Sequence, residues 1–174
     1  MKQQILVSGI GGQGVILATR ILAEAAMEAG HDILASETHG MAMRGGTVIS
    51  HVKIGAFKSP LIRKGQADTG LFLHQMNLDI HGPLMKKEGH LYVNASSPVE
   101  APSIDATGLA KEAGSAVVAN LVLLGFAISG GRLFCNAELA EKVIRSISQP
   151  KQLEMNLRGF HIGLAAGKKS FSAE

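Results

Sequence analysis

The feature that most constrains the fold of this chain is its opening, where an apolar run leads into a cluster of glycines. Residues 5–7 are Ile-Leu-Val, and four of the six residues from 9 to 14 are glycine. Gly9, Gly11 and Gly14 have the spacing G-x-G-x-x-G, which is typical of a dinucleotide-binding strand-turn-helix unit. Such a turn exposes its backbone, and the helix that follows directs free N–H groups toward an anion. The opening therefore predicts a phosphate-bearing ligand, and a structural turn that binds nothing is the alternative.

A nucleotide site of the Rossmann type also needs an acidic residue that ends the second strand and holds the ribose. Glu37 follows the expected strand 32–36 at a suitable distance from the glycines. Residues 38–46 after it, Thr-His-Gly-Met-Ala-Met-Arg-Gly-Gly, are not typical of a ribose-binding loop. The chain also lacks a Tyr-x-x-x-Lys pair, and its one tyrosine, Tyr92, falls inside an expected strand. A freestanding NAD(P)-binding reductase is therefore kept as an alternative function.

Hydrophobic periodicity predicts strands that alternate with helices along the whole chain. This order predicts an α/β fold, a Rossmann-like sandwich with a largely parallel sheet flanked by helices, in one domain over residues 1–174. Strand 47–54 alternates and is expected to have one face wetter than the other. The expected strands are 32–36, 47–54, 70–73 and 90–94 besides the first, and the expected helices are 15–29, 75–87, 105–114, 116–129, 136–147 and an amphipathic segment after Pro150.

Composition narrows the classes of function. With 174 residues and 46% hydrophobic content, the chain can bury the core of one domain. The net charge of +3 is spread along the sequence and there is no tryptophan, so nucleic-acid binding is not supported. We expect a cytoplasmic protein, because no secretory signal is visible and no apolar stretch approaches the roughly 20 residues of a membrane span. The single cysteine, Cys135, excludes an internal disulfide framework and an iron–sulfur cluster, and no metal site is expected.

A second glycine cluster lies between the second and third expected strands. Arg44 is followed directly by Gly45 and Gly46 within residues 39–46. In a parallel sheet this loop is expected at the carboxyl edge, beside the turn at 9–14. Arg44 would then supply a positive charge to a phosphate, and a solvated Arg44 in an ordinary loop is the alternative.

The ordered set of motifs is more specific than either glycine cluster alone. It comprises residues 9–15, 39–48, 59–62 and 67–68, followed by 120–125 and 156–160. Together these segments resemble the gamma subunit of 2-oxoacid:ferredoxin (acceptor) oxidoreductases, the group that acts on pyruvate, 2-oxoisovalerate, 2-oxoglutarate or indolepyruvate. The resemblance runs from the N-terminus through Asn156. Residues 74–79 depart from the family, which often has a glutamate-containing segment there, so the sequence does not indicate which oxoacid is used.

The resemblance implies a cytoplasmic hetero-oligomer that performs coenzyme A-dependent oxidative decarboxylation of a 2-oxoacid. Thiamine diphosphate and iron–sulfur clusters would lie on the alpha, beta and ferredoxin-like delta subunits, and ferredoxin would receive the electrons. This chain would be a non-catalytic subunit, since it lacks the Gly-Asp-Gly motif of thiamine enzymes. It would help to assemble the complex, through an apolar patch from 71–76 or from helix 116–129, and would contribute to coenzyme A binding. An assembly-only subunit is the other alternative.

The residues expected to bind coenzyme A are Gly11, Gly12, Gln13, Gly14, Arg44, Gly45 and Gly46. His39 and Met43 either line the path of coenzyme A or pack in the core or at a subunit interface.

Overall fold

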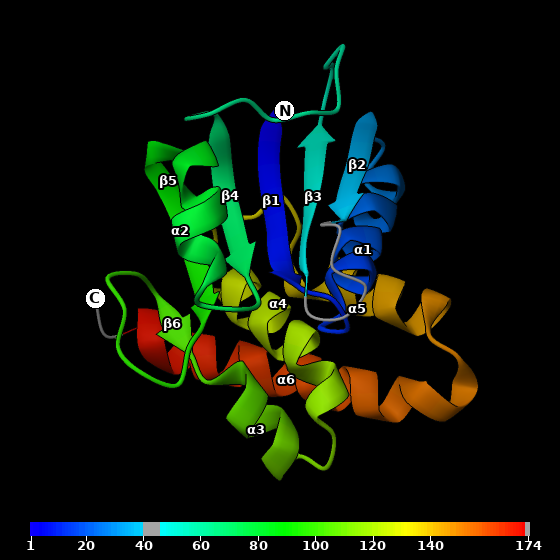
Figure 1. The fold of residues 1–174 in the computed structure, drawn as a ribbon. Helices are drawn as coiled ribbons and strands as arrows, with labels where there is room; N and C mark the ends of the chain where they lie inside the picture. Colours follow the sequence, from blue (N-terminus) through cyan, green and yellow to red (C-terminus); the bar gives the residue numbers. More distant parts are fainter. Residues whose placement is uncertain (40–45, 173–174) are drawn as a thin grey trace.

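The computed structural model describes residues 1–39, with His39 by its backbone alone, and residues 46–172. Within these ranges a six-stranded sheet is flanked by helices (Figure 1). The predicted α/β class is confirmed. The elements are β1 (Gln3–Ile10), α1 (Val15–Glu28), β2 (Ile33–His39), β3 (Thr47–Ile54), β4 (Ala67–Phe72), α2 (Asn77–His81), η1 (Gly82–Leu84), β5 (Met85–Asn94), β6 (Ser103–Ile104), α3 (Ala106–Glu112), η2 (Ala116–Val118), α4 (Ala119–Ser129), α5 (Ala137–Ile147) and α6 (Pro150–Phe171).

The strand order is β2-β3-β1-β4-β5-β6. β1 pairs in parallel with β4, β4 with β5, and β5 with β6, whereas β3 runs antiparallel to both β1 and β2. The sheet is therefore largely parallel, as predicted, with β3 as the reversed strand. The carboxyl ends of β1, β2, β4 and β5 share one edge, and the turn after β1 lies on that edge (Figure 1).

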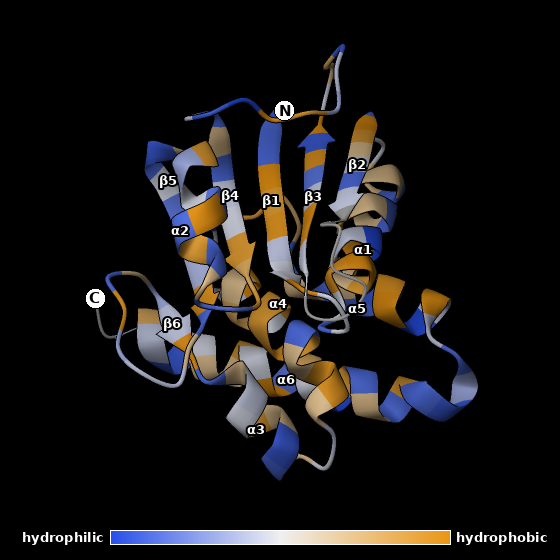
Figure 2. Cartoon of the chain, in the orientation of Figure 1, coloured by the Kyte–Doolittle hydropathy of each residue, from blue (hydrophilic) through white to orange (hydrophobic). Residues whose placement is uncertain are grey.

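One face of the sheet carries the main core. Ile5 and Val7 of β1 are fully buried against a cluster that includes Leu22 of α1 and Leu123 of α4. Residues 120–128 of α4 are buried, because the helix lies between the sheet and α6, and its ribbon is mostly hydrophobic in Figure 2. The expectation that helix 116–129 offers an apolar patch to partner subunits is therefore wrong for α4; just before it, Ala116 and Val117 are exposed.

Helices α4 and α6 approach each other through glycines. Gly159, Gly163 and Gly167 recur every fourth residue of α6, and Gly125 lies opposite them on α4. A Cβ added to Gly163 would lie 2.8 Å from the Val122 carbonyl carbon, and one added to Gly125 would lie 2.9 Å from the Leu164 nitrogen. The two backbones are thus in direct contact, which a larger side chain would prevent.

The other face of the sheet is covered more thinly. Leu6 of β1 and Phe72 of β4 pack there with Leu78 of α2 and with Ile62 from the segment after β3. α2 lies in front of this face in Figure 1. Its residue Ile80 and the neighbouring Met76 expose 53% and 64% of their surface, so part of the expected patch at 71–76 is exposed.

Two local predictions were wrong. The expected helix 75–87 is only the five residues of α2, because Gly82 and Pro83 turn the chain into η1 and β5 already begins at Met85. The expected wet face of β3 is buried: Ile62 N–H donates to His51 Nδ1 (3.2 Å), and the Lys53 ammonium lies over the Phe57 ring.

Candidate functional site

The glycine turn links β1 to α1 and leaves the start of that helix open. Gly12 and Gly14 have φ of 92° and 80°, a left-handed conformation that favours glycine. A Cβ on Gly14 would also lie 2.8 Å from Asn120 Cγ, and the Asn120 amide donates to the Gly14 carbonyl (3.1 Å). At Gly12 an added Cβ would meet none of the described residues within 4 Å. Within the described ranges α1 has no side-chain N-cap and no acidic residue in its first turn, so neither compensates the positive end of its dipole.

Two of the predicted backbone donors are already used within the chain. Gly11 N–H donates to the Gly46 carbonyl (3.0 Å), and Gln13 N–H donates to the Ile10 carbonyl (3.1 Å). The expectation that all four N–H groups of the turn face a ligand is therefore wrong for Gly11 and Gln13. Among the described residues the N–H groups of Gly12 and Gly14 have no acceptor, so an anion at this turn depends on these two and on the first turn of α1.

The side chain of Gln13 fixes the shape of the turn. Its Oε1 accepts from Ile10 N–H (2.8 Å), and its Nε2 donates to the Leu73 carbonyl at the end of β4 (3.0 Å). The amide thereby joins the carboxyl ends of β1 and β4. Gln13 is thus a positioning residue for the turn, with one Nε2 hydrogen directed away from the Leu73 bond.

A pocket of about 570 Å³ opens beside this turn, at the carboxyl ends of β4 and β5. Gln13 and Asn94 line both it and a smaller pocket of about 200 Å³ that reaches Gly12. Lys111 of α3 lines the larger pocket and brings a positive charge, opposed there by Asp105. The Asp105 carboxylate caps α3 by accepting from Gly108 N–H (2.8 Å).

Sequence reasoning missed the far wall of this pocket. Asn94 Nδ2 donates to the Leu73 carbonyl (3.0 Å) and to Thr107 Oγ1 (2.8 Å), and its Oδ1 accepts from Thr107 N–H (3.2 Å). Asn94 thus ties the end of β5 to α3. A signal was available, since a polar residue that ends an apolar strand in a parallel sheet lies at the ligand-binding edge.

The second glycine cluster contacts the turn at 9–14 through Gly46. Gly46 accepts the hydrogen bond from Gly11, and β2 and β3 pair up to His39 and Val48 on either side of the loop. The prediction that this loop lies beside the turn at 9–14 is confirmed at Gly46. Met43, Arg44 and Gly45 lie outside the described residues, as does the side chain of His39, so their predicted roles stay predictions.

Near the turn, a small polar cluster links β1 to α2 on the thinly covered face of the sheet. Asn77 Nδ2 donates to Ser8 Oγ (2.8 Å) and to the Gly9 carbonyl (2.7 Å), and Ser8 Oγ lies 2.7 Å from His81 Nδ1. Burial lowers the pKa of His81. A neutral His81 can accept a hydrogen bond from the Ser8 hydroxyl at Nδ1, which fits a structural link between β1 and α2.

Among residues 1–39 and 46–172 we find no group of three side chains suited to hold a metal ion. None of the helices in these ranges is long and apolar enough to cross a membrane.

The comparisons with known proteins agree with the geometry of the turn and the sheet. Residues 4–166 match the family model described as pyruvate ferredoxin/flavodoxin oxidoreductase. Indolepyruvate oxidoreductase subunit IorB of Archaeoglobus fulgidus is 30% identical over 94% of both chains. A solved keto/oxoacid ferredoxin oxidoreductase gamma subunit from Geobacter sulfurreducens is 32% identical, with a TM-score of 0.76 over 95% of this chain and 98% of that one.

A second solved structure shares the fold at lower identity. It is a 2-oxoglutarate:ferredoxin oxidoreductase from Magnetococcus marinus with 2-oxoglutarate, coenzyme A and succinyl-CoA bound. It is 21% identical with a TM-score of 0.79, and the match covers 97% of this chain and 31% of that one. On these grounds the chain belongs to the pyruvate ferredoxin/flavodoxin oxidoreductase family, in which it is similar to the separate gamma-type subunits.

Proposed function

We propose that this chain is the gamma-type subunit of a coenzyme A-dependent 2-oxoacid:ferredoxin oxidoreductase and that it contributes to coenzyme A binding at the glycine turn. Family membership over residues 4–166 supports the subunit role. The proposal of a ligand rests on the start of α1: among the described residues it has no side-chain cap, and a Cβ added to the adjoining Gly12 would meet nothing within 4 Å.

The residues at this edge fit a phosphate-bearing ligand. The N–H groups of Gly12 and Gly14 and the first turn of α1 would receive one phosphate. Arg44, which the sequence places between β2 and β3, would pair with another. The pocket lined by Gln13, Asn94 and Lys111 has a volume within the usual range for small-molecule sites. Coenzyme A supplies the thiol that accepts the acyl group.

The partners of the chain follow from the same proposal. Relatives of this chain are named as subunits of indolepyruvate, 2-oxoglutarate and ketoisovalerate enzymes. We infer that this chain works in the cytoplasm with alpha, beta and ferredoxin-like delta subunits, which hold thiamine diphosphate and the iron–sulfur clusters. The alternative of a freestanding NAD(P)-dependent reductase is disfavoured by the family, and an assembly-only subunit is the competing outcome of the experiment below.

The experiment compares two variants, one with a negative charge added near the start of α1 and one with the same charge added near its end. Ile16 and Met27 are exposed to 51% and 52% and lie in the first and last turns of the helix. In Ile16→Glu a carboxylate about 8 Å from a bound phosphate would cost about 0.5–2 kcal/mol at an effective dielectric constant between 80 and 20, or about 2- to 30-fold in affinity. Met27→Glu adds the same charge at the opposite end and should leave coenzyme A affinity unchanged. The readout is calorimetric titration of the assembled complex with coenzyme A.

Arg44→Ala is a further variant whose affinity for coenzyme A is measured. Loss of one charge-assisted contact of about 1.5–3 kcal/mol predicts an affinity about 10- to 150-fold lower. Release of carbon dioxide in the absence of coenzyme A should stay near the normal rate, since neither residue is asked to touch the oxoacid. If Ile16→Glu and Arg44→Ala both bind coenzyme A like the wild type in an intact complex, the assembly-only alternative is correct.

A further inference from the structure

A second pocket lies at the opposite edge of the sheet, about 25 Å from the glycine turn if measured along the eight residues of β1. It has a volume of about 540 Å³ and lies where the segment after β3 crosses the amino end of β1. Four of its lining side chains are cations, and the described residues that line it include no carboxylate. We call it the basic pocket; its cations are Lys53, Lys58, Arg63 and Lys64.

Lys53 is the unusual member of this set. It pairs with Gln4 in the register of β3 with β1, and only 8% of its surface is exposed. Its ammonium lies over the Phe57 ring, 5.1 Å from the centroid, and the described residues place no acidic side chain in an ion pair with it. The Lys2 ammonium lies over the same ring at 5.3 Å. Lysine is rarely buried this far without a counter-charge, because the loss of hydration of the ammonium must be offset.

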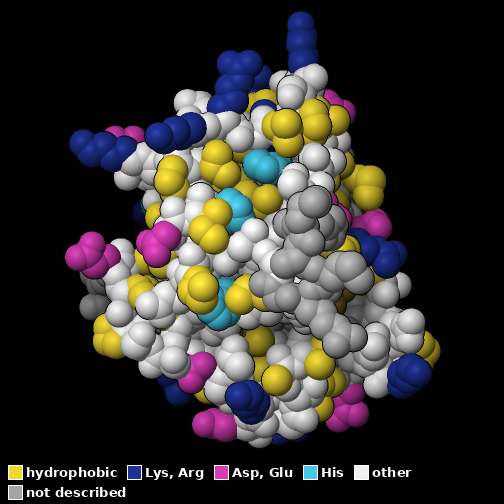
Figure 3. Space-filling model, viewed as in Figure 1, with side chains coloured by type: hydrophobic (Ala, Val, Ile, Leu, Met, Phe, Trp, Pro, Cys, Tyr) yellow, Lys and Arg dark blue, Asp and Glu magenta, His cyan; other side chains and the backbone are white. Residues whose placement is uncertain are grey.

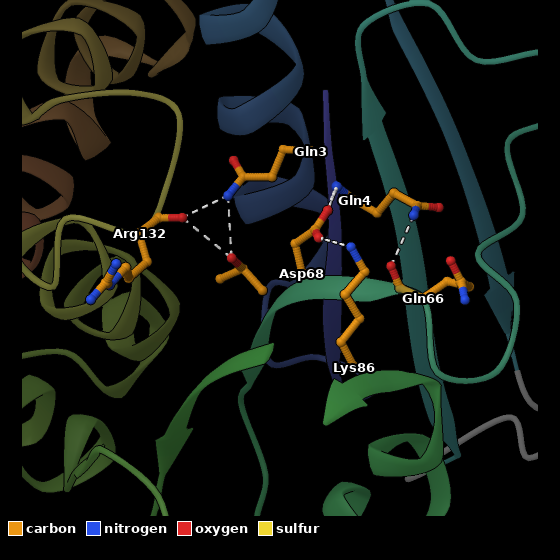
Figure 4. Close-up of polar contacts among 7 residues, drawn as sticks. Gln3, Gln4, Gln66, Asp68, Lys86 and Arg132 are labelled. Carbon is orange, nitrogen blue, oxygen red and sulfur yellow. Dashed lines mark hydrogen bonds and ion pairs between the residues drawn. The ribbon is translucent and has the colours of Figure 1, made fainter. Parts of the chain in front are cut away.

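Asp68, a carboxylate at this edge, does not provide that counter-charge. Asp68 accepts from Gln4 N–H (2.7 Å) and forms an ion pair with Lys86, so its charge is already compensated (Figure 4). Gln4 Nε2 in turn donates to the Gln66 carbonyl (2.9 Å), which fixes the rim of the basic pocket. Asp68 does not line the pocket.

Positive charge dominates this edge of the molecule. Lysine and arginine side chains gather along the upper edge in Figure 3, over the region where the basic pocket lies, while the net charge of the whole chain is only +3. Like charges that share one pocket repel one another, and the repulsion is larger for a partly buried group such as Lys53. A multivalent anion would remove this repulsion.

We infer that the basic pocket binds a multivalent anion of the phosphate class, such as the polyphosphate part of a small molecule. Three to four negative charges would match the four lining cations. Arg63 offers a planar fork that suits phosphate oxygens, and the buried Lys53 offers a point charge that a compact group can reach. The site is independent of the glycine turn, which lies at the other end of β1.

The test is calorimetric titration of the full chain with inorganic tripolyphosphate at low and moderate salt. We expect saturable binding with one site per chain, which weakens as salt rises. Lys58→Gln with Lys64→Gln should weaken it at least tenfold. The matched control, Lys168→Gln with Lys169→Gln, removes the same charge from the exposed end of α6 and should change the affinity less than twofold.

Lys53→Met separates a ligand-binding role from a structural one. It removes the unpaired buried charge and keeps an apolar chain, so the midpoint of thermal unfolding without ligand should stay equal or rise, while binding of tripolyphosphate falls at least tenfold. Arg63→Gln, on the exposed rim, tests the same loss of binding if Lys53→Met does not fold. Equal weakening in both double variants, or full binding by Lys53→Met or Arg63→Gln, would overturn the inference. Tighter binding of a hexaglutamate peptide than of tripolyphosphate would also overturn it, because the pocket would then recognise an acidic protein segment.

Discussion

The contact between α4 and α6 predicts a large effect from one added methyl group. In Gly163→Ala the new Cβ would lie 2.8 Å from the Val122 carbonyl carbon and 2.9 Å from the Phe126 nitrogen. Ordinary contact begins near 3.4 Å, so the helices must separate by at least 0.6 Å, and because these are backbone atoms no side-chain rotation relieves the clash. Overpacking of this kind costs about 1–3 kcal/mol or more, and here it acts along a 22-residue helix. Because the clash is between backbone atoms, the cost lies at the upper end of this range or above it; alanine returns about 1 kcal/mol of helix propensity, so we expect a net loss of about 2 kcal/mol or more.

The assay is urea unfolding followed by circular dichroism, with thermal unfolding as a second measure. For a chain of this length a loss of about 2 kcal/mol corresponds to a midpoint about 4–8 °C lower, and a larger loss lowers it further. Gly82→Ala is the matched control, because its backbone has a negative φ and an added Cβ would meet nothing within 4 Å. It should be neutral or stabilising by up to about 1 kcal/mol. If Gly163→Ala is as stable as Gly82→Ala with the same denaturant slope, the direct backbone contact is refuted.

Three further outcomes are expected. Burial lowers the pKa of His51 and of His81 below 6.5. The stability that depends on these neutral histidines is therefore present above pH 6.5 and is lost as pH falls from there through the folded-state pKa. Urea unfolding should give a lower free energy of unfolding at pH 5.5 than at pH 7.5, by at most about 1.4 kcal/mol per pH unit for each histidine. Burial raises the pKa of the Cys135 thiol to about 12, so a thiol reagent at pH 8 should label it only as fast as the protein unfolds, and rapid labelling of folded protein would contradict this. Gln13→Leu removes two hydrogen bonds between the turn and its neighbours and should cost about 1–3 kcal/mol in the same urea assay, whereas no loss would show that the amide is dispensable.

The sequence predicted the parts of the fold that depend on local pattern. β3 has its predicted bounds, and α1, α3, α4 and α5 agree with their expected ranges to within a few residues, because apolar periodicity and capping residues are local signals. Asn136, for example, caps α5 by accepting from Leu139 N–H (2.9 Å). The glycine stripe on α6 was missed, since glycine lowers helix propensity and its benefit appears only in the contact with α4.

The candidate site was predicted in part for the same reason. The turn at 9–14 and its proximity to Gly46 followed from the order of strands and glycines. The sequence did not show which N–H groups of the turn remain available to a ligand, because the acceptors of Gly11 and Gln13 are fixed only by the folded turn. Lys111 and Thr107 come to the pocket from α3, a distant segment whose placement depends on β5 and β6. The basic pocket was equally hidden, since its cations are spread from residue 53 to residue 64 without forming a run.

The position of β3 in the sheet argues against the NAD(P)-binding function that the glycine fingerprint also allowed. In a Rossmann unit the second strand lies beside the first, so the acidic residue at its end reaches the ribose of a nucleotide bound at the turn. Here β3 lies between β1 and β2, and Glu37 is in register with Ser50 of β3, which pairs with Val7 of β1. With strands about 4.8 Å apart, Glu37 is about 10 Å from β1 instead of about 5 Å. The connection from β2 to β3 covers only residues 40–46, too short for a crossover helix between parallel strands, which agrees with the antiparallel pairing of β2 and β3. Its consequence is that Gly46, at the start of β3, takes the place beside the glycine turn where a ribose-binding acid would be needed, which disfavours the NAD(P)-binding alternative.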